Sequence, residues 1–126
     1  MLHRKATYFS PAISLTGGSL HISGRLWMEN PQAYFEDVFS CTKKSSTGRF
    51  SVTLDVEHLN SSSIKQLLIY FILLKEMKDK GHFDFVHIVW NIPEDDNELK
   101  EVIHDLAHVS EINIEIHTFN PEKNSL

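Results

Sequence analysis

The 126-residue sequence has a single cysteine, Cys41, and lacks any long hydrophobic segment. One thiol cannot form an intramolecular disulfide, which excludes the disulfide-rich secreted frameworks and favours a reducing compartment. The longest uninterrupted apolar run, residues 67–74, is far shorter than the roughly 20 residues that span a bilayer. The first residues also lack the apolar segment of a secretory signal. We therefore expect a cytoplasmic protein with no segment inserted in a membrane.

Positive charge and catalytic motifs are also scarce. Lys and Arg total 12 against 17 Asp and Glu, for a formal net charge of -5, which disfavours binding to the phosphates of nucleic acid. The sequence has no Gly-rich phosphate loop and no recognisable set of nucleophile, base and oxyanion donors. Cys41 has no paired histidine in sequence, so we interpret it as a buried or incidental thiol. We expect no nucleic-acid partner, no cofactor, no metal and no enzymatic activity.

The overall composition is that of an ordinary globular protein. Hydrophobic residues make up 41% and charged residues 23% of the chain, which excludes disordered and fibrous classes. A chain of this length has room for one hydrophobic core. We expect a single domain over residues 1–126, with its core from about residue 8 to residue 119 and a short tail over residues 120–126.

The first part of the chain predicts an antiparallel hairpin. Apolar residues alternate with polar ones over residues 8–15 and again over residues 20–23. The Gly17-Gly18 pair between these segments is typical of a hairpin turn. Pro11 removes one hydrogen-bond donor from the first strand, which favours a place at the edge of a sheet.

The rest of the chain alternates between helical and strand patterns. We predict helices over residues 31–44, from residues 60–63 to 80–81, and from residues 95–98 to 110–111, with strands over residues 50–56, 83–90 and 112–117. Strands that alternate with helices indicate parallel pairing through right-handed crossovers. The predicted fold is therefore α/β, a mixed five-stranded sheet with an N-terminal hairpin, βαβαβ crossovers and about three helices.

The predicted helix that begins near residue 60 is apolar on nearly every side. Ile69, Tyr70 and Leu73 lie opposite the apolar stripe that contains Leu67 and Phe71. One interpretation is a helix wedged between the sheet and a neighbouring helix. Another is a docking surface, and a third is a homo-oligomer in which this helix pairs with itself. Periodicity does not separate the three.

A serine cluster precedes that helix. Residues 60–63 read Asn-Ser-Ser-Ser, which is typical of a helix N-cap. The functional alternative is phosphorylation, because a phosphate at a helix N-terminus meets unpaired backbone N–H groups and the positive end of the helix dipole. The fold would tolerate such a phosphate, so its effect would be on a partner.

Two further patterns carry weaker alternatives. His104 and His108 are four residues apart on the predicted third helix, and with Glu101 they define a metal-binding or small-ligand α/β domain as the alternative function. Two points argue against this alternative: His104 and His108 are predicted to face outward, and they are not part of a known metal-binding motif. The acidic run over residues 94–96 is typical of a solvated helix start, and Glu29 with Asn30 is suited either to cap the first helix or to contact a partner.

Several segments, in their order and spacing, resemble one known family. These are Ser10-Pro11 at the start of a strand, Gly24-Arg25 followed by Glu29-Asn30-Pro31 before an aromatic-bearing helix, Leu59-Asn60-Ser61-Ser62-Ser63 at the start of a long helix, and Glu94-Asp95-Asp96 after the fourth strand. From about residue 10 to residue 119 the chain resembles the SiaC-type regulatory phosphoproteins. That family is similar in fold to STAS domains, the domains of anti-sigma factor antagonists.

The resemblance implies a switch between partners. In that family a cognate kinase phosphorylates a Ser or Thr at the start of the second helix and a PP2C-type phosphatase removes the phosphate. The unphosphorylated form activates a diguanylate cyclase and so influences cyclic-di-GMP signalling and biofilm formation. By motif position the modified residue here is Ser61, with Ser62 as the reserve choice. The residues that we expect to contact a partner are Glu29, Asn30, Asn60, Ser62, Ser63, Lys65, Ile69 and Leu73.

The chain departs from the family pattern at two places. The usual Tyr-Pro-Glu-Asn is Trp27-Met28-Glu29-Asn30, and the expected phosphoacceptor is serine where the best-known members have threonine. Neither change removes the hydroxyl group that phosphorylation requires.

Overall fold

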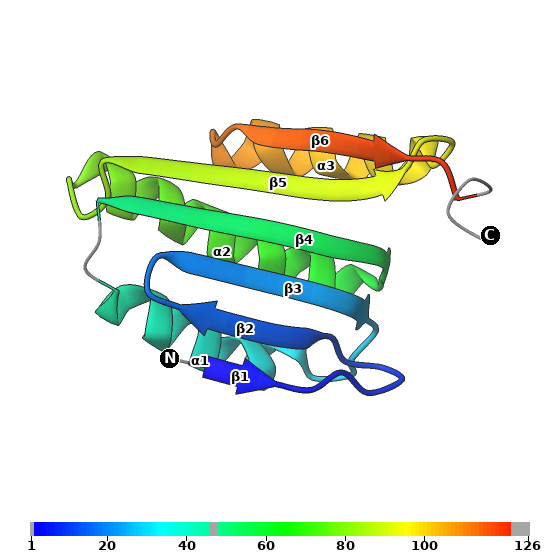
Figure 1. The fold of residues 1–126 in the computed structure, drawn as a ribbon, viewed down its shortest axis with the longest axis horizontal. Helices are drawn as coiled ribbons and strands as arrows, with labels where there is room; N and C mark the ends of the chain where they lie inside the picture. The colour runs from blue at the N-terminus through cyan, green and yellow to red at the C-terminus, as the bar shows by residue number, and fades with distance from the viewer. Residues whose placement is uncertain (1, 46–47, 122–126) are drawn as a thin grey trace.

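The computed structural model describes residues 2–45 and 48–121. Over these residues the chain forms six strands and three helices (Figure 1). The elements are β1 (Leu2–Arg4), β2 (Ala12–Thr16), β3 (Ser19–Leu26), α1 (Pro31–Lys44), β4 (Arg49–Leu59), α2 (Ser61–Asp79), β5 (Phe85–Pro93), α3 (Asn97–Ser110) and β6 (Ile114–Phe119).

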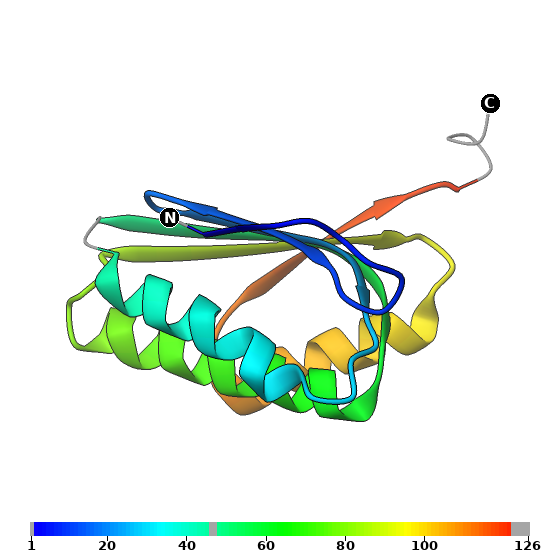
Figure 2. The same cartoon turned by 90° about the horizontal axis from the view of Figure 1, so that it is seen from below.

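The strands form one mixed sheet in the order β1-β2-β3-β4-β5-β6. β1, β2 and β3 pair antiparallel, whereas β3, β4, β5 and β6 pair parallel. Each parallel connection passes through one helix, and all three helices lie on the same face of the sheet (Figure 2). When right-handed crossover connections join neighbouring strands in the order of the chain, their helices all lie on one face of the sheet. The expected mixed α/β class with three helices is confirmed.

The N-terminal edge of the sheet differs from the expectation. The sheet has six strands rather than five, because β1 pairs with the outer side of β2, with Leu2 opposite Leu15. The predicted edge position of the first hairpin strand was therefore wrong. β2 also begins at Ala12, so that Pro11 lies just before it and removes no ladder hydrogen bond. Three residues are too few to show the alternation that identifies a strand, which is why β1 was missed.

Side chains of α1 hold this edge in place. Arg4 at the end of β1 pairs with Asp37, and its guanidinium lies 5.1 Å from the centre of the Tyr34 ring. The Tyr34 hydroxyl donates a hydrogen bond to the Pro11 carbonyl. Burial raises the pKa of Tyr34 to about 12, so this hydroxyl stays protonated as a donor. The short β1 is thus tied to the helical layer as well as to β2.

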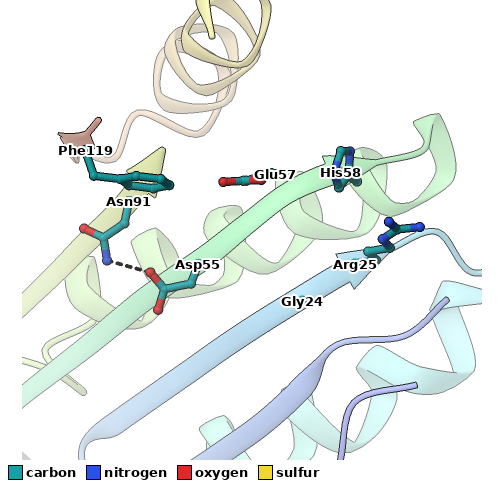
Figure 3. A pocket seen from close by; sticks show the side chains of 7 residues that line it. All are labelled: Gly24, Arg25, Asp55, Glu57, His58, Asn91 and Phe119. Atoms are coloured by element: carbon teal, nitrogen blue, oxygen red, sulfur yellow. Dashed lines mark hydrogen bonds between the residues drawn. The ribbon is translucent and has the colours of Figure 1, made fainter. Parts of the chain in front are cut away.

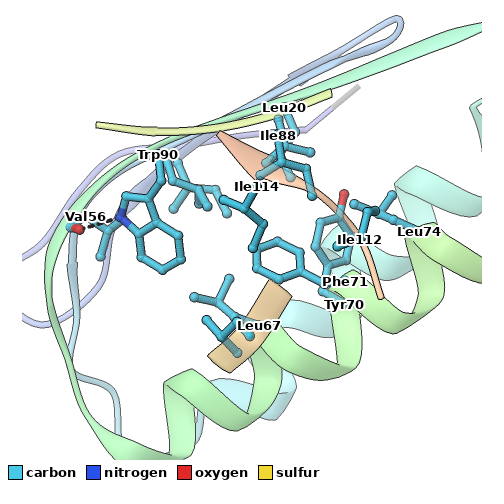
Figure 4. Packing of buried hydrophobic residues seen from close by; sticks show 14 of the residues in the cluster. Leu20, Val56, Leu67, Tyr70, Phe71, Leu74, Ile88, Trp90, Ile112 and Ile114 are labelled. Atoms are coloured by element: carbon cyan, nitrogen blue, oxygen red, sulfur yellow. Dashed lines mark hydrogen bonds between the residues drawn. The ribbon is translucent and has the colours of Figure 1, made fainter. Parts of the chain in front are cut away.

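The apolar character of α2 is explained by packing on three sides. Leu67, Phe71 and Leu74 are completely buried, and Figure 4 shows them facing strand residues such as Ile88. On the side of α1, the Tyr70 ring stacks on Phe39 with 5.6 Å between ring centres. α2 also contacts α3 on its other side. The interpretation of a helix wedged between the sheet and its neighbours is confirmed for most of its length.

Two large side chains inside this core have their polar groups paired, whereas the buried Ser63 hydroxyl at the start of α2 has no hydrogen-bond partner among the described residues. The Tyr70 hydroxyl and Thr42 Oγ1 lie 2.9 Å apart, and burial raises the pKa of Tyr70. Trp90 Nε1 donates to the Val56 carbonyl oxygen at 2.8 Å, so the largest buried side chain has its one donor satisfied (Figure 4). Buried polar groups with partners avoid the desolvation cost of unpaired ones.

In the described part of the chain the opposite face of the sheet has no helix over it, and most of its side chains are polar. Strand residues alternate between the buried helix side and this open face, as in β4, where Val52 and Leu54 are buried and Asp55 is exposed. Among residues 2–45 and 48–121, no helix is both long and apolar enough to cross a membrane.

Candidate functional site

Asn60 fixes the beginning of α2. Its side-chain oxygen accepts a hydrogen bond from the Ser63 amide at 3.0 Å, which confirms the expected N-cap. Its side-chain nitrogen donates to the Met28 carbonyl at 2.9 Å, and its own amide donates to the Leu26 carbonyl at 3.0 Å. One residue therefore joins the start of α2 to the segment that follows β3.

The three serines after Asn60 occupy different environments. Ser61 and Ser62 are exposed, whereas Ser63 is completely buried. The Ser62 hydroxyl lies 3.4 Å from Asn60 Oδ1. The backbone amides of Ser61 and Ser62 lie in the first turn, where a helix provides no acceptor for them. Ser61 and Ser62 are thus accessible to an enzyme, and Ser63 is not part of the surface.

Three exposed aromatic side chains lie near the same end of the sheet. Tyr8, Phe9 and Trp27 are 67%, 56% and 51% exposed, and we call them the aromatic surface. The rings of Tyr8 and Phe9 meet edge to face at 4.8 Å, and the Arg25 guanidinium lies 4.5 Å from the centre of the Tyr8 ring. The Trp27 amide donates to the Phe9 carbonyl at 2.9 Å. Aromatic groups exposed together are typical of a contact surface for another protein.

A hollow joins the aromatic surface to the start of α2. Its volume is about 510 Å³, and Phe9, Trp27, Glu29 and Asn60 line it. The structure thus brings together Glu29 and Asn60, which the sequence pattern indicated, with two aromatic residues that it did not. Tyr8 and Phe9 were interpreted as part of a strand, but they lie in the loop before β2. A signal for this was available, because Pro11 follows them closely and disfavours a continuous strand.

The other residues expected at a partner surface are more scattered. Asn30 is exposed before α1, and its side chain makes no capping hydrogen bond. Lys65 is exposed on the second turn of α2. Farther along, Ile69 is 40% exposed, whereas Leu73 is partly buried against the core. Of the proposed docking face on α2, the part nearest Ser61 is the more accessible.

A second hollow lies on the open face at the carboxyl ends of the parallel strands (Figure 3). Its volume is about 420 Å³, and it is lined by Gly24, Arg25, Asp55, Glu57, His58, Asn91 and Phe119. Asp55 accepts hydrogen bonds from Asn91 at 2.8 Å and contacts His21 at 2.6 Å. Arg25 and His58 also line a hollow with the aromatic surface, so the two regions are continuous. The lining of this hollow carries both positive and negative side chains, so it is suited to contact a polar surface of another protein.

The alternative site on α3 does not assemble into a metal centre. His104 and His108 are both exposed, and His104 lines a shallow hollow with Glu101 and Asp105. Among the residues that the structure describes, no three His, Cys, Asp or Glu side chains are grouped so that they could hold a metal ion. In the acidic run, Asp96 caps α3 by accepting a hydrogen bond from the Leu99 amide at 3.0 Å.

Comparisons with known proteins converge on one family. The model of the SiaC family regulatory phosphoproteins matches residues 4–119. Apo-SiaC from Pseudomonas aeruginosa is 24% identical, with a TM-score of 0.79 over 93% of this chain and 98% of the other. A chain in the crystal structure of the diguanylate cyclase SiaD in complex with its activator SiaC, from the same organism, is 22% identical, with a TM-score of 0.84 over 94% and 100%. These structures share the fold. A search of curated proteins finds no match.

Proposed function

Because the chain belongs to the SiaC family of regulatory phosphoproteins, we propose that it is a non-enzymatic signalling adaptor switched by phosphorylation of Ser61. The observation that carries the proposal is the position of Ser61, which is exposed and follows Asn60, a residue that lines the hollow with Phe9 and Trp27. Unphosphorylated, this region binds a partner protein, and phosphorylated, it does not.

The start of α2 is suited to accept a phosphate without loss of the fold. A phosphate adds about -1.5 to -2 charges at neutral pH. At Ser61 this charge lies at the positive end of a 19-residue helix, close to amides that have no intrahelical acceptor. Lys65, one turn farther along, provides a cation on the same side of the helix. Ser62 remains the reserve site, although its hydroxyl already lies near Asn60.

The same charge would oppose binding of a partner to the aromatic surface. Burying Phe9 and Trp27 against another protein removes water from the hollow that they share with Asn60. An unpaired charge in a desolvated contact costs about 3–5 kcal/mol, which is enough to weaken a micromolar interaction to roughly the millimolar range. Modification therefore changes the surface and not the fold of the adaptor.

The proposed partner is a diguanylate cyclase. SiaC, which has a similar fold, is the activator of the cyclase SiaD in a crystal structure of the two proteins in complex. By family membership we add a cognate kinase, a PP2C-type phosphatase, and an output in cyclic-di-GMP signalling and biofilm formation. The exposed aromatic surface supports a protein partner, since exposed aromatic clusters occur at such contacts.

The proposal is tested by measuring the affinity of variants for the candidate cyclase by calorimetry. We expect Ser61→Ala to bind like the unmodified chain and Ser61→Asp to bind at least about tenfold more weakly. Asn97→Asp is the matched control, because it adds one negative charge to the exposed first turn of α3 instead. The control should leave the affinity unchanged.

Two results would count against Ser61 as the switch. A loss of affinity with Ser62→Asp but not with Ser61→Asp would move the switch to the reserve serine. Equal affinity of all four variants, together with no phosphate on the peptide that contains Ser61 after incubation with the cognate kinase, would contradict the switch.

A further inference from the structure

The two edges of the sheet differ in how they are protected. β1, at the bottom of the sheet in Figure 1, has three residues and is tied to α1 by the Arg4–Asp37 pair. β6, at the top, has six residues and contains neither proline nor lysine. No strand lies beyond β6 among residues 2–45 and 48–121. Long regular edges expose unpaired backbone groups, and soluble proteins usually cover or interrupt them.

We propose that β6 is an interface at which a second copy of this chain pairs antiparallel with it. The pairing would join two sheets into one around a twofold axis that passes through Ile116. Symmetric pairing of identical edges is a closed arrangement, so it produces a dimer and not a fibre. The surface is distinct from the aromatic surface and from the start of α2, and so does not depend on the proposed switch.

The order of side chains along β6 is complementary to itself. With Ile116 opposite its own copy, Glu115 lies opposite His117 of the second copy, and His117 lies opposite Glu115. Residues directly opposite in an antiparallel pair have side chains on the same face and close together. Both residues are exposed on the open face. Two carboxylate–imidazole pairs thus form across the axis, while Ile116 meets its own copy on the helix side.

Other registers lose this complementarity. Shifting the axis to Glu115 places two carboxylates opposite each other, and shifting it to His117 does the same with two imidazoles. An axis that passed between two neighbouring residues would set open-face residues opposite residues of the helix side. Paired strands do not allow this, because residues directly opposite each other have their side chains on the same face. The charge order therefore favours a single register.

The Glu115 carboxylate has capacity for a further hydrogen bond. His87 Nε2 lies 3.1 Å from Oε2, and His117 Nε2 of the same chain lies 3.0 Å from the same oxygen. Neither imidazole contacts Oε1 in the part of the chain that the structure describes. A carboxylate accepts several hydrogen bonds, so Oε1 is suited to a donor from the second copy.

Sedimentation velocity over a wide range of concentrations tests the interface. We expect the unmodified chain to dimerise, and either His117→Glu or Glu115→Lys to weaken dimerisation by roughly tenfold or more. His117→Glu places two carboxylates opposite each other, and Glu115→Lys places an ammonium group opposite an imidazole. His3→Glu, the same change on the exposed β1, is the matched control and should leave the dimer intact.

Restoration of pairing identifies the register. A chain carrying both His117→Glu and Glu115→Lys should dimerise again, because the swapped charges are complementary. The two singly substituted chains should also form a mixed dimer when combined. Circular dichroism of each variant confirms that it is folded.

Three results would overturn the proposal. The first is an unmodified chain that stays monomeric at every concentration. The second is a dimer that neither single change weakens. The third is a dimer that is lost with Ile69→Lys instead, which would place the contact on α2.

Discussion

The two faces of the sheet use the same strands for opposite purposes. On the helix side, Leu54 and Trp90 are completely buried beneath α2. On the open side, their neighbours Asp55 and Asn91 make an exposed hydrogen bond to each other. Burial of apolar area stabilises a fold strongly, whereas exposed polar pairs contribute little because water competes for them. The fold therefore depends on one face, which leaves the other face and the sheet ends to vary with function.

The largest expected effect contrasts one phenylalanine from each side. Phe71 of α2 is completely buried, whereas Phe85 lies on the open face and is 48% exposed. Phe71→Ala should lower the free energy of unfolding by about 3–5 kcal/mol, because it leaves a cavity in the core. Phe85→Ala should lower it by less than about 1 kcal/mol. Urea unfolding of both variants measures the difference, and equal losses would show that the open face is covered in solution.

The second effect concerns the aromatic surface, which belongs to neither face. If the proposed cyclase binds here, Trp27→Ala should weaken that binding by about 2 kcal/mol or more, as for an aromatic residue at the centre of a contact. Its stability should change little, since only the Trp27 backbone amide bonds to Phe9. Phe85→Ala is the control for loss of an exposed ring elsewhere. Calorimetric titration would contradict the assignment if both variants bound equally well.

A smaller effect is expected for the polar pair inside the helical layer. Tyr70→Phe removes the hydroxyl next to Thr42 and should cost about 1–3 kcal/mol of unfolding free energy, because it leaves a buried group without its partner. Adding Thr42→Val replaces the second polar group with an apolar one of similar shape. The double variant should therefore lose less stability than the sum of the single changes. Additive losses in thermal or urea unfolding would mean that the two groups do not interact.

The sequence pattern predicted the helix side of the sheet better than the carboxyl ends of its strands. Periodicity identified the three helices, and the capping residues 60–63 predicted where α2 begins, with Asn60 as its N-cap in the structure. The sequence pattern did not predict β1, which is too short to show an alternation. It also wrongly predicted a strand at Tyr8 and Phe9, because aromatic residues are typical of strands in general. Conformation there depends on contacts such as that of Trp27 with Phe9, which join residues far apart in sequence.

The hollow of Figure 3 was missed for a related reason. Asp55 and Asn91 come from different strands and meet only through the register of β4 with β5. Alternation along each strand shows which face a residue occupies, but it does not show which residue on the next strand lies beside it. Hollows that are built across strands therefore need the structure, whereas a helix cap within one turn, such as that of residues 60–63, is visible in sequence.

The smallest expected effect is the pH dependence of the open face. Two hydrogen bonds lower the pKa of the Glu115 carboxyl in the folded chain; the one from His87 has the larger effect and the one from His117 the smaller. A carboxyl with a depressed pKa adds stability at pH values above its unfolded pKa, about 4.3, and that stability is lost as the pH falls through the folded value.

Glu115→Gln removes this titration while it keeps the shape of the side chain. The unmodified chain should be slightly more stable than the variant near neutral pH, and the gap should close as the solution is acidified below the unfolded pKa of glutamate. Glu101→Gln, a change at an exposed position on α3, is the control. Thermal unfolding at a series of pH values tests this. A gap that stayed constant into the acid range would mean that the two histidines do not lower the pKa of Glu115 in the folded chain.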